Sequence, residues 1–284
     1  MKDTFPKDAI RPDPRTPEAK AKDHTHEKLY SGLPAVWLEK PQSTWFLPSQ
    51  RNQSTSYSCL YQSAATAIES INRNVQSAIP YKLRSGGAGS QGDFLQNVGD
   101  VLYNTGTVLE SDCPSENMSD PQIDATPLPS PMTVKATGYR TIGTITIEAV
   151  AEAVQAYGNC ILIFSSNTQE WQLTPVYLGT PTTFGHAICA TDFTTISGVK
   201  TLICRDSAGQ FSSPTGVRLI TENFLNSRCR GAMYLLGAKI VPPISPVDAN
   251  ASNTVGYWTK FFANLKAWYL GLPQPYPNIP LGSA

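Results

Sequence analysis

The sequence predicts an α+β fold with two lobes, an N-terminal helical lobe and a C-terminal lobe of antiparallel strands. Three observations support this. Apolar residues recur at helical spacing in the first half of the chain, and short apolar runs separated by turn residues fill the second half. Of the 284 residues, 40% are hydrophobic and only 15% are charged, so the middle of the chain can bury a sizeable core.

Three segments have the apolar periodicity of helices. The first begins at Cys59 and runs to about residue 72, the second covers residues 92–106, and the third covers residues 147–157. The second segment stops at Gly106 and the third ends before Gly158, as helices commonly end at a glycine.

From residue 160 onward the pattern changes to short apolar runs. Residues 160–164, 186–192, 200–205, 217–220 and 232–236 are predicted strands, separated by glycine, proline and threonine turns. A cleft between the helical lobe and this β lobe, which could form a barrel, is a natural place for a site.

The two ends of the chain differ from the middle. Residues 1–32 form a polar arm broken by prolines, a short propeptide-like or docking segment, and residues 33–237 form the folded domain. Residues 238–254 are a linker rich in proline, serine and asparagine. Residues 255–284 are an amphipathic helix and tail with an aromatic face, which either packs on its own domain or a sister subunit, or docks on a protein partner or a membrane surface.

Composition excludes several functions. Lysine plus arginine equals aspartate plus glutamate, 22 against 22, so no basic field is available for nucleic acid. No apolar run is long enough for a transmembrane segment, and residues 1–31 lack the apolar stretch of a signal peptide. We therefore expect a cytoplasmic protein or a component of a particle.

No cofactor or metal is expected. The six cysteines contain no CxxC pair and are too sparse for a disulfide scaffold, so buried free thiols are favoured over disulfides. His24 and His26 stand two apart and could chelate a metal, but in a charged arm they are more often solvated.

His186 opens an apolar strand, where a histidine needs a hydrogen-bonding partner. The next strand ends at Asp206, and the turn near residues 195–199 folds the two strands into a hairpin. Paired residue numbers would then sum to about 392, which places His186 beside Asp206. A carboxylate at that position holds the imidazole in one tautomer and favours its cationic form.

Cys59 stands at the predicted start of the first helix, where unpaired backbone N–H groups and the helix dipole stabilise a thiolate. With an imidazolium nearby it would form an ion pair that attacks carbonyl carbon. Gln53 lies six residues earlier. Its amide and the backbone N–H of Cys59 could form an oxyanion hole, whose donors each contribute about 3 kcal/mol in comparable sites.

Residues 52–64, in which a glutamine precedes by six positions a cysteine that opens a helix, resemble the active-site signature of papain-like cysteine peptidases. Gly185-His186-Ala187 resembles the family's histidine strand, and residues 206–209 stand where the family has Asn-Ser-Trp-Gly. The resemblance covers roughly residues 33–237 and implies the papain-like two-lobed fold with the site in the cleft. It implies Cys59, His186, Asp206 and Gln53 as catalytic residues and Gly89, Ser90 and Gly185 as substrate-binding residues.

The chain departs from the family pattern at several positions. Ser56 replaces a cysteine of a nearby disulfide, Leu60 replaces the tryptophan after the nucleophile, and Asp206 replaces the orienting asparagine. Ala208 replaces the tryptophan that shields the histidine from water, so a more exposed and weaker His–Asp pair is expected. The arm is also shorter than the family's usual propeptide, and either occludes the cleft in a reduced way or is no propeptide.

These features predict a cysteine peptidase that hydrolyses peptide bonds of a peptide or protein substrate through an acyl-enzyme. The alternative is a papain-like fold used as a structural or docking part of a larger assembly, such as a phage virion, with weak or lost catalysis. Bacteriocin-leader peptidases share the Gln-Cys-His-Asp order but fit the middle of the chain less well.

Overall fold

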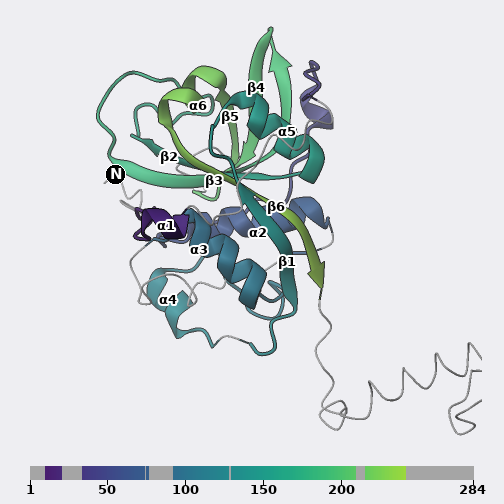
Figure 1. Cartoon of the computed structure of the whole chain (residues 1–284), viewed down its shortest axis with the longest axis vertical. Helices are drawn as coiled ribbons and strands as arrows, with labels where there is room; N and C mark the ends of the chain where they lie inside the picture. The colour runs from purple at the N-terminus through teal and green to yellow at the C-terminus, as the bar shows by residue number, and fades with distance from the viewer. Residues whose placement is uncertain are drawn as a thin grey trace, which may run out of the picture. The chain divides into compact units, whose positions relative to one another are not determined.

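The computed structural model describes residues 10–20, 34–73, 75–76, 92–127, 129–208 and 215–240 (Figure 1). The helical elements are α1 (Pro17–Lys20), η2 (Gln42–Thr44), α2 (Cys59–Ile71), α3 (Leu95–Asp100), η4 (Val101–Thr105), α4 (Asp120–Ala125), α5 (Ile147–Tyr157) and α6 (Glu222–Arg228). The strands are β1 (Val134–Thr141), β2 (Cys160–Ser166), β3 (Phe184–Ile196), β4 (Val199–Arg205), β5 (Val217–Thr221) and β6 (Cys229–Ile240). The predicted α+β class is confirmed.

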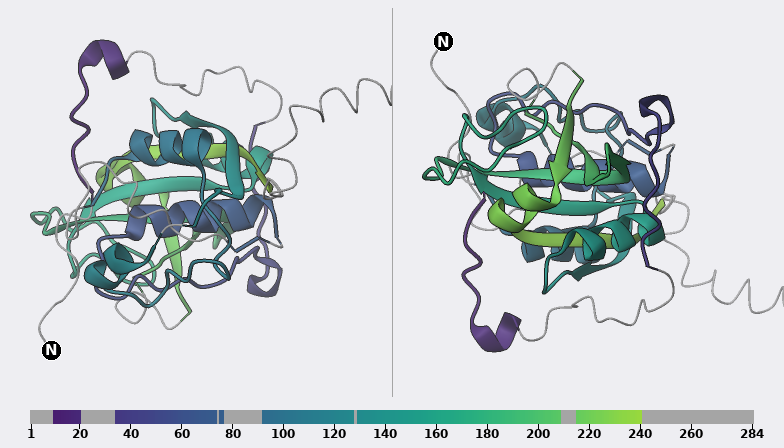
Figure 2. Two further views of the ribbon diagram at one scale, coloured as in Figure 1. Left: turned by 90° about the horizontal axis from the view of Figure 1, so that it is seen from below. Right: turned by 90° about the horizontal axis from the view of Figure 1, so that it is seen from above.

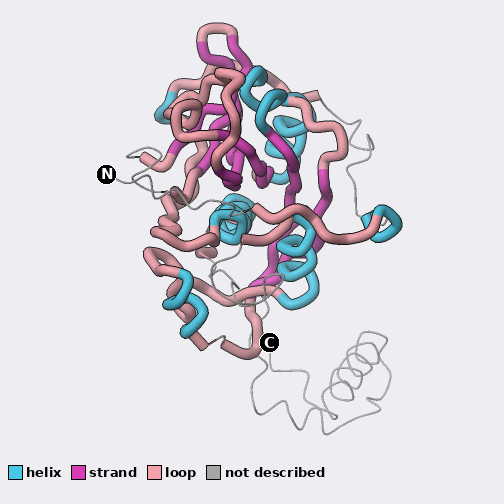
Figure 3. The backbone as a smooth tube through the Cα atoms, turned by 90° about the vertical axis from the view of Figure 1, so that its left-hand side faces the viewer, coloured by secondary structure: helices cyan, strands magenta, loops and turns pink. Residues whose placement is uncertain are grey.

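The strands form one six-stranded antiparallel sheet in the order β1-β6-β2-β3-β4-β5. Helix α2 packs on strands β3, β6 and β2, and the two views of Figure 2 show it running alongside the strands. Figure 3 shows the same helix end-on, with strands above it and loops below. Helix α2 is therefore held against the central strands of the sheet.

Two hydrophobic cores divide the fold into its two lobes. The first contains Tyr61 and Ile68 of α2 together with Val98 of α3. The second contains Val150 of α5 and Phe224 of α6, packed on the part of the sheet made by β2 to β5. Strands β2, β3 and β6 contribute residues to both cores, so the sheet connects the lobes.

The three predicted helices are confirmed with small changes. Helix α2 begins at Cys59 as expected, and α5 ends before Gly158, whose φ of 74° is left-handed. The segment 92–106 begins later than expected, at Leu95, and its second half is the π-helical turn η4, which ends at Gly106 with a φ of 87°.

All five predicted strands are present, and each is longer than its apolar run. Strand β6 continues to Ile240, into residues assigned from sequence to the linker. Strand β1 and helix α6 were not predicted from the sequence. In β1 the burial alternates imperfectly and Gly138 interrupts the pattern, which explains the weak strand signal.

The register predicted for the β3–β4 hairpin is wrong by two residues, because Cys189 pairs with Arg205 rather than with Ile203. The turn consists of Ser197 and Gly198, with φ of 50° and 80°, which is the signature of a two-residue hairpin turn. A bulge between Ala190 and Asp192 shifts the pairing once more.

In the part of the chain that the structure describes, no helix is both long and apolar enough to cross a membrane. The predicted aromatic segment 255–284, the rest of the linker beyond β6, and His24 and His26 lie outside the described residues.

Candidate active site

Cys59 is fully buried at the first turn of α2, and a hydrogen-bonded loop leads into it. Arg51 donates from Nε to Oε1 of Gln62, over 2.6 Å, and from Nη2 to Oε2 of Glu110, over 2.9 Å. Ser54 adopts a left-handed φ of 53°, and its backbone N–H donates to the side chain of Asn52 over 2.9 Å. This loop therefore reaches Cys59 by a fixed path.

Gln53 connects the loop to the strand side of the site. Its backbone N–H donates to the carbonyl oxygen of Ser207 over 2.9 Å, and its Oε1 accepts from the Ser207 hydroxyl over 2.8 Å. The Nε2 group donates one hydrogen to the carbonyl oxygen of Ser56 over 3.0 Å. Its second hydrogen makes no hydrogen bond to a residue that the structure describes.

Ser56 stands where the resemblance predicts a cysteine. Its hydroxyl lies 2.6 Å from the carbonyl oxygen of Gln53 and 2.6 Å from the hydroxyl of Ser58, and all three residues are buried. Hydrogen bonds between neighbouring serines therefore tie this loop without a disulfide.

His186 and Asp206 form a buried pair on the strand side. Nε2 of His186 lies 2.7 Å from Oδ1 of Asp206, and both side chains have an exposed fraction of 0%. The contact is made although the predicted register is wrong, because Asp206 directly follows Arg205, the last paired residue of β4, and its side chain spans the remaining offset to His186. The structure thus brings these two predicted residues together.

The imidazole also interacts with Cys59. Burial lowers the pKa of His186, but the carboxylate of Asp206 and the thiol of Cys59 outweigh burial and raise the pKa to about 9. Burial likewise opposes ionisation of Asp206, yet His186 and Arg218 hold the pKa of that carboxyl well below its usual value. Because Nε2 is engaged by Asp206, Nδ1 is the ring nitrogen left for the sulfur.

Two residues at this site were missed from the sequence. Trp171, in the loop between β2 and β3, donates from Nε1 to Oδ2 of Asp206 over 3.1 Å. Arg218 of β5 donates from Nε to the same oxygen over 3.1 Å, and its guanidinium lies 5.3 Å from the centre of the Trp171 ring. A charged residue between apolar neighbours in 217–220 was the available signal for Arg218, whereas no local pattern marks a loop tryptophan.

The expected exposure of the His–Asp pair is wrong. Ala208 does stand in place of the shielding tryptophan, but Trp171 covers the pair from another loop. Its ring is perpendicular to the His186 ring with centroids 5.6 Å apart. The site therefore excludes water although the family's usual tryptophan is absent.

Of the predicted substrate-binding residues, Gly185 is described, and Gly89 and Ser90 lie outside the described residues. Gly185 directly precedes His186 in β3, and a side chain at this position would meet Ile10, at 3.2 Å from its Cβ. The absence of a side chain at Gly185 thus makes room for a neighbouring chain segment.

Residues of the N-terminal arm occupy that space. The backbone N–H of Arg11 donates to the carbonyl oxygen of Asp93 over 2.9 Å, and Ile10 forms a parallel β-bridge with Asp93. Ile10 packs on the first core, and the Arg15 guanidinium lies 5.7 Å from the centre of the Phe94 ring.

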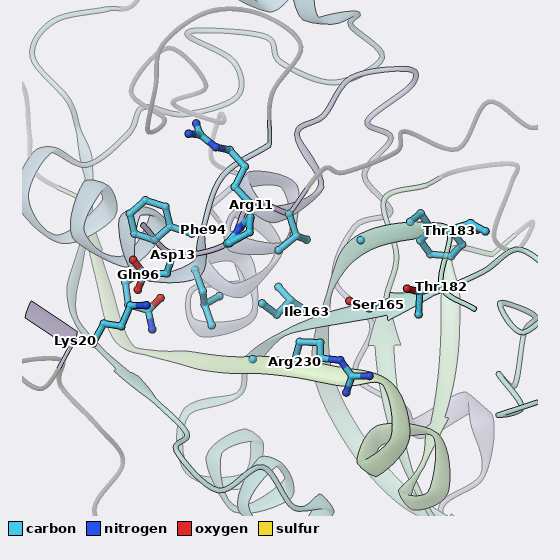
Figure 4. Close-up of a pocket in the computed structure, with 16 residues that line it drawn as sticks. Arg11, Asp13, Lys20, Phe94, Gln96, Ile163, Ser165, Thr182, Thr183 and Arg230 are labelled. Carbon is cyan, nitrogen blue, oxygen red and sulfur yellow. The ribbon is translucent and has the colours of Figure 1, made fainter. Parts of the chain in front are cut away.

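A cavity of about 560 Å³ lies beside this arm segment (Figure 4). Arg11 and Phe94 are on one side of it, and Ser165 and Thr183 are on the other. Arg230 of β6 also lines it. The arm and Gly185, the residue before His186, are thus both part of the wall of this pocket.

Comparisons with known proteins agree on the fold. No protein-family model matches the chain, and no curated protein matches it. Among solved structures, the chain is similar to xylellain, a cysteine protease from Xylella fastidiosa, with a TM-score of 0.62 and 16% identity over 80% of this chain and 95% of that one.

Two further structures are similar. Procathepsin L 3 of the Tenebrio molitor larval midgut has a TM-score of 0.55 and 15% identity, over 75% of this chain and 74% of that one. The cysteine protease and lectin-like domains of Cwp84 from Clostridium difficile have a TM-score of 0.58 and 14% identity, over 79% of this chain and 54% of that one. The chain therefore has the α+β two-lobed fold of the papain-like cysteine proteases.

Proposed function

We propose that this protein is a cysteine peptidase that hydrolyses peptide bonds through a Cys59 acyl-enzyme. The observation that carries the proposal is the His186–Asp206 contact of 2.7 Å, which engages Nε2 and leaves Nδ1 for the sulfur at the start of α2. The peptidase fold shared with solved cysteine proteases supports the same reading.

In the proposed reaction the thiolate of Cys59 attacks the carbonyl carbon of the scissile peptide bond, while His186 carries the proton. The backbone N–H of Cys59 and the second Nε2 hydrogen of Gln53 then stabilise the oxygen that becomes negative. The Ser207 hydroxyl favours this orientation of the amide, because it donates to Oε1 of Gln53 over 2.8 Å.

The tetrahedral intermediate collapses when His186 gives its proton to the leaving amine, and an acyl-enzyme remains on Cys59. The neutral imidazole then removes a proton from an incoming water, which attacks the acyl carbon. Release of the carboxylic acid restores the sulfur and the protonated imidazole. Asp206 stays ionised throughout and keeps the ring in one orientation.

We also propose that the arm restrains this site, as a short propeptide-like segment would. The support is the position of Ile10 against Gly185 and of Arg11 on Asp93, since a substrate would have to displace both contacts. Ile10→Asp should loosen the arm, because placing a carboxylate against the apolar core costs free energy. Glu18→Gln is the matched control on the same arm, in α1.

The decisive experiment is labelling of the folded full-length chain, and of its Ile10→Asp variant, by an epoxide or vinyl-sulfone peptide inhibitor. We expect one adduct on Cys59, faster in Ile10→Asp than in Glu18→Gln, and no adduct on Cys113, another buried thiol. Turnover of a mixed peptide library should fall by about 10³-fold or more in Cys59→Ala.

An unlabelled Cys59 in both folded proteins, with no peptide turnover, would overturn the peptidase proposal. That result would favour the alternative role, in which the fold serves as a structural or docking part of a larger assembly.

A further inference from the structure

Asp206 accepts four hydrogen bonds, two on each oxygen. Oδ1 accepts from Nε2 of His186 over 2.7 Å and from the backbone N–H of Ala208 over 2.8 Å. Oδ2 accepts from Nε1 of Trp171 over 3.1 Å and from Nε of Arg218 over 3.1 Å. A carboxylate has about four lone-pair positions, so this arrangement leaves the group one orientation.

Arg218 is an unusual residue for its location. Its side chain has an exposed fraction of 0%, and Nη1 and Nη2 make no hydrogen bond within the part of the chain that is described. A buried guanidinium with unpaired nitrogens costs free energy, so packing alone gives no reason for an arginine here. Its ion pair with Asp206, through Nε, does give a reason.

We propose that Arg218 is a positioning residue that neutralises Asp206, so that an ion pair without net charge orients His186. An uncharged amide would orient the ring in the same way, which is how a carboxylate can stand in the position of the family's asparagine. This inference rests on the proposed function for its catalytic meaning, but its physical content concerns the imidazole alone.

The charged and titratable groups near the imidazole come from several elements. Cys59 faces it from α2, and Asp206 from the segment after β4. Behind Asp206 stand Arg218 of β5 and Cys204 of β4. Burial raises the pKa of the Cys204 thiol well above its usual value. Arg218 and a protonated His186 imidazole are both positive and both pair with the Asp206 carboxylate. Arg218 therefore limits how strongly Asp206 can favour protonation of the imidazole.

Three variants separate the charges. Arg218→Met leaves the imidazole as the one charged partner of the Asp206 carboxylate among the described residues, so the midpoint of His186 titration should rise by about one pH unit. Asp206→Asn leaves the guanidinium uncompensated, so the midpoint should fall and the protein should lose stability. Asp206→Asn/Arg218→Met removes both charges, and its midpoint should lie between those of the single variants.

The measurement is a pH titration of the full chain with labelled imidazole rings, followed by NMR. The chain has three histidines, and a His186→Gln sample identifies the signal of interest. Lys40→Met is the control, since it also removes the cation of an ion pair, with Asp192, and Lys40 is not part of the site. We expect Lys40→Met to leave the His186 midpoint unchanged.

A His186 midpoint that is the same in Arg218→Met as in the wild type would overturn the inference and leave Arg218 a purely structural residue. If Arg218→Met does not fold, thermal unfolding of the double variant and of Asp206→Asn tests the inference instead. The double variant should melt above Asp206→Asn, and a double variant that melts at or below it would also overturn the inference.

The titration uses no substrate, so it is independent of the proposed activity. Midpoints that move as expected in a chain that cleaves no peptide would overturn the peptidase proposal and support the charge pairing. If the chain is active, the alkaline limb of the pH profile of kcat/KM should move with the His186 midpoint across the same variants.

Discussion

The two sides of the candidate site are built differently. On the nucleophile side, the loop before Cys59 is held by many hydrogen bonds, and its charged partners Glu110 and Glu116 are 16% and 25% exposed. On the imidazole side, the side chains of His186, Asp206 and Arg218 are 0% exposed, and the Asp206 carboxylate pairs with both His186 and Arg218. Water can reach the carboxylates of Glu110 and Glu116 if they lose a partner, but it cannot reach the charges of the second side, so we expect the loss of a charged partner to cost more on the imidazole side.

The largest effect should follow from Asp206→Ala. This change leaves the charge of Arg218 buried without its partner, and the free energy of unfolding should fall by about 3–5 kcal/mol. The control is Asp192→Ala, whose partner Lys40 has a side chain 30% exposed, so it can be rehydrated. A loss of only about 1–2 kcal/mol is expected there by denaturant titration. Equal losses would contradict the comparison.

The second effect concerns stability against pH. The pKa of His186 is raised from 6.5 to about 9, so its contribution is fully present below pH 6.5 and is lost as the pH rises through about 9. Between these limits, the stability of the wild type should fall relative to His186→Gln by an amount on the order of 3 kcal/mol. Denaturant titrations of both proteins at pH 6 and pH 10 measure this. A constant difference between the two proteins would show that the folded state does not hold the proton.

A smaller effect is expected for Trp171→Phe. The ring remains over His186, but Oδ2 of Asp206 loses the indole donor and keeps only Arg218. Stability should fall by about 1.5–3 kcal/mol, as for other hydrogen bonds to charged groups. Trp171→Ala should add an acceleration of hydrogen exchange near the site, because it also opens the pair to water. Exchange equal in the two variants would mean that the ring is not the shield.

The smallest effect should come from the nucleophile side. Ser56→Ala removes one hydroxyl from a loop that keeps its other contacts, and about 1 kcal/mol is expected. Ser207→Ala should cost similar stability but should reduce kcat more than it raises KM, because it frees the Gln53 amide to rotate. Equal kinetic effects in the two serine variants would argue against a special role for the amide.

Much of the fold and of the candidate site could be predicted because its signals are local. The apolar face after Cys59, the glycine after α5 and the apolar strand around His186 each follow from a few neighbouring residues. The hairpin turn was predicted in the right place, and the hairpin brought His186 and Asp206 together even though the pairing register was wrong by two residues.

The remaining parts depend on tertiary contacts. Trp171 reaches Asp206 from a loop 35 residues away, and no periodicity marks it. Arg218 gains its role from lying on the strand next to β4, which only the strand order establishes. For this reason the sequence predicted an exposed pair, whereas the folded chain buries it with residues of unrelated segments.

The serine contacts before α2 have a consequence for redox chemistry. All six cysteines are free thiols, and hydroxyl groups link the residues ahead of Cys59 where the resemblance to papain-like peptidases implied a disulfide. Dithiothreitol, which would keep the nucleophile reduced, therefore has no covalent cross-link to break in this scaffold. Folding and thiol reactivity should respond to oxidants separately, so that an oxidised sample loses its chemistry while retaining its shape.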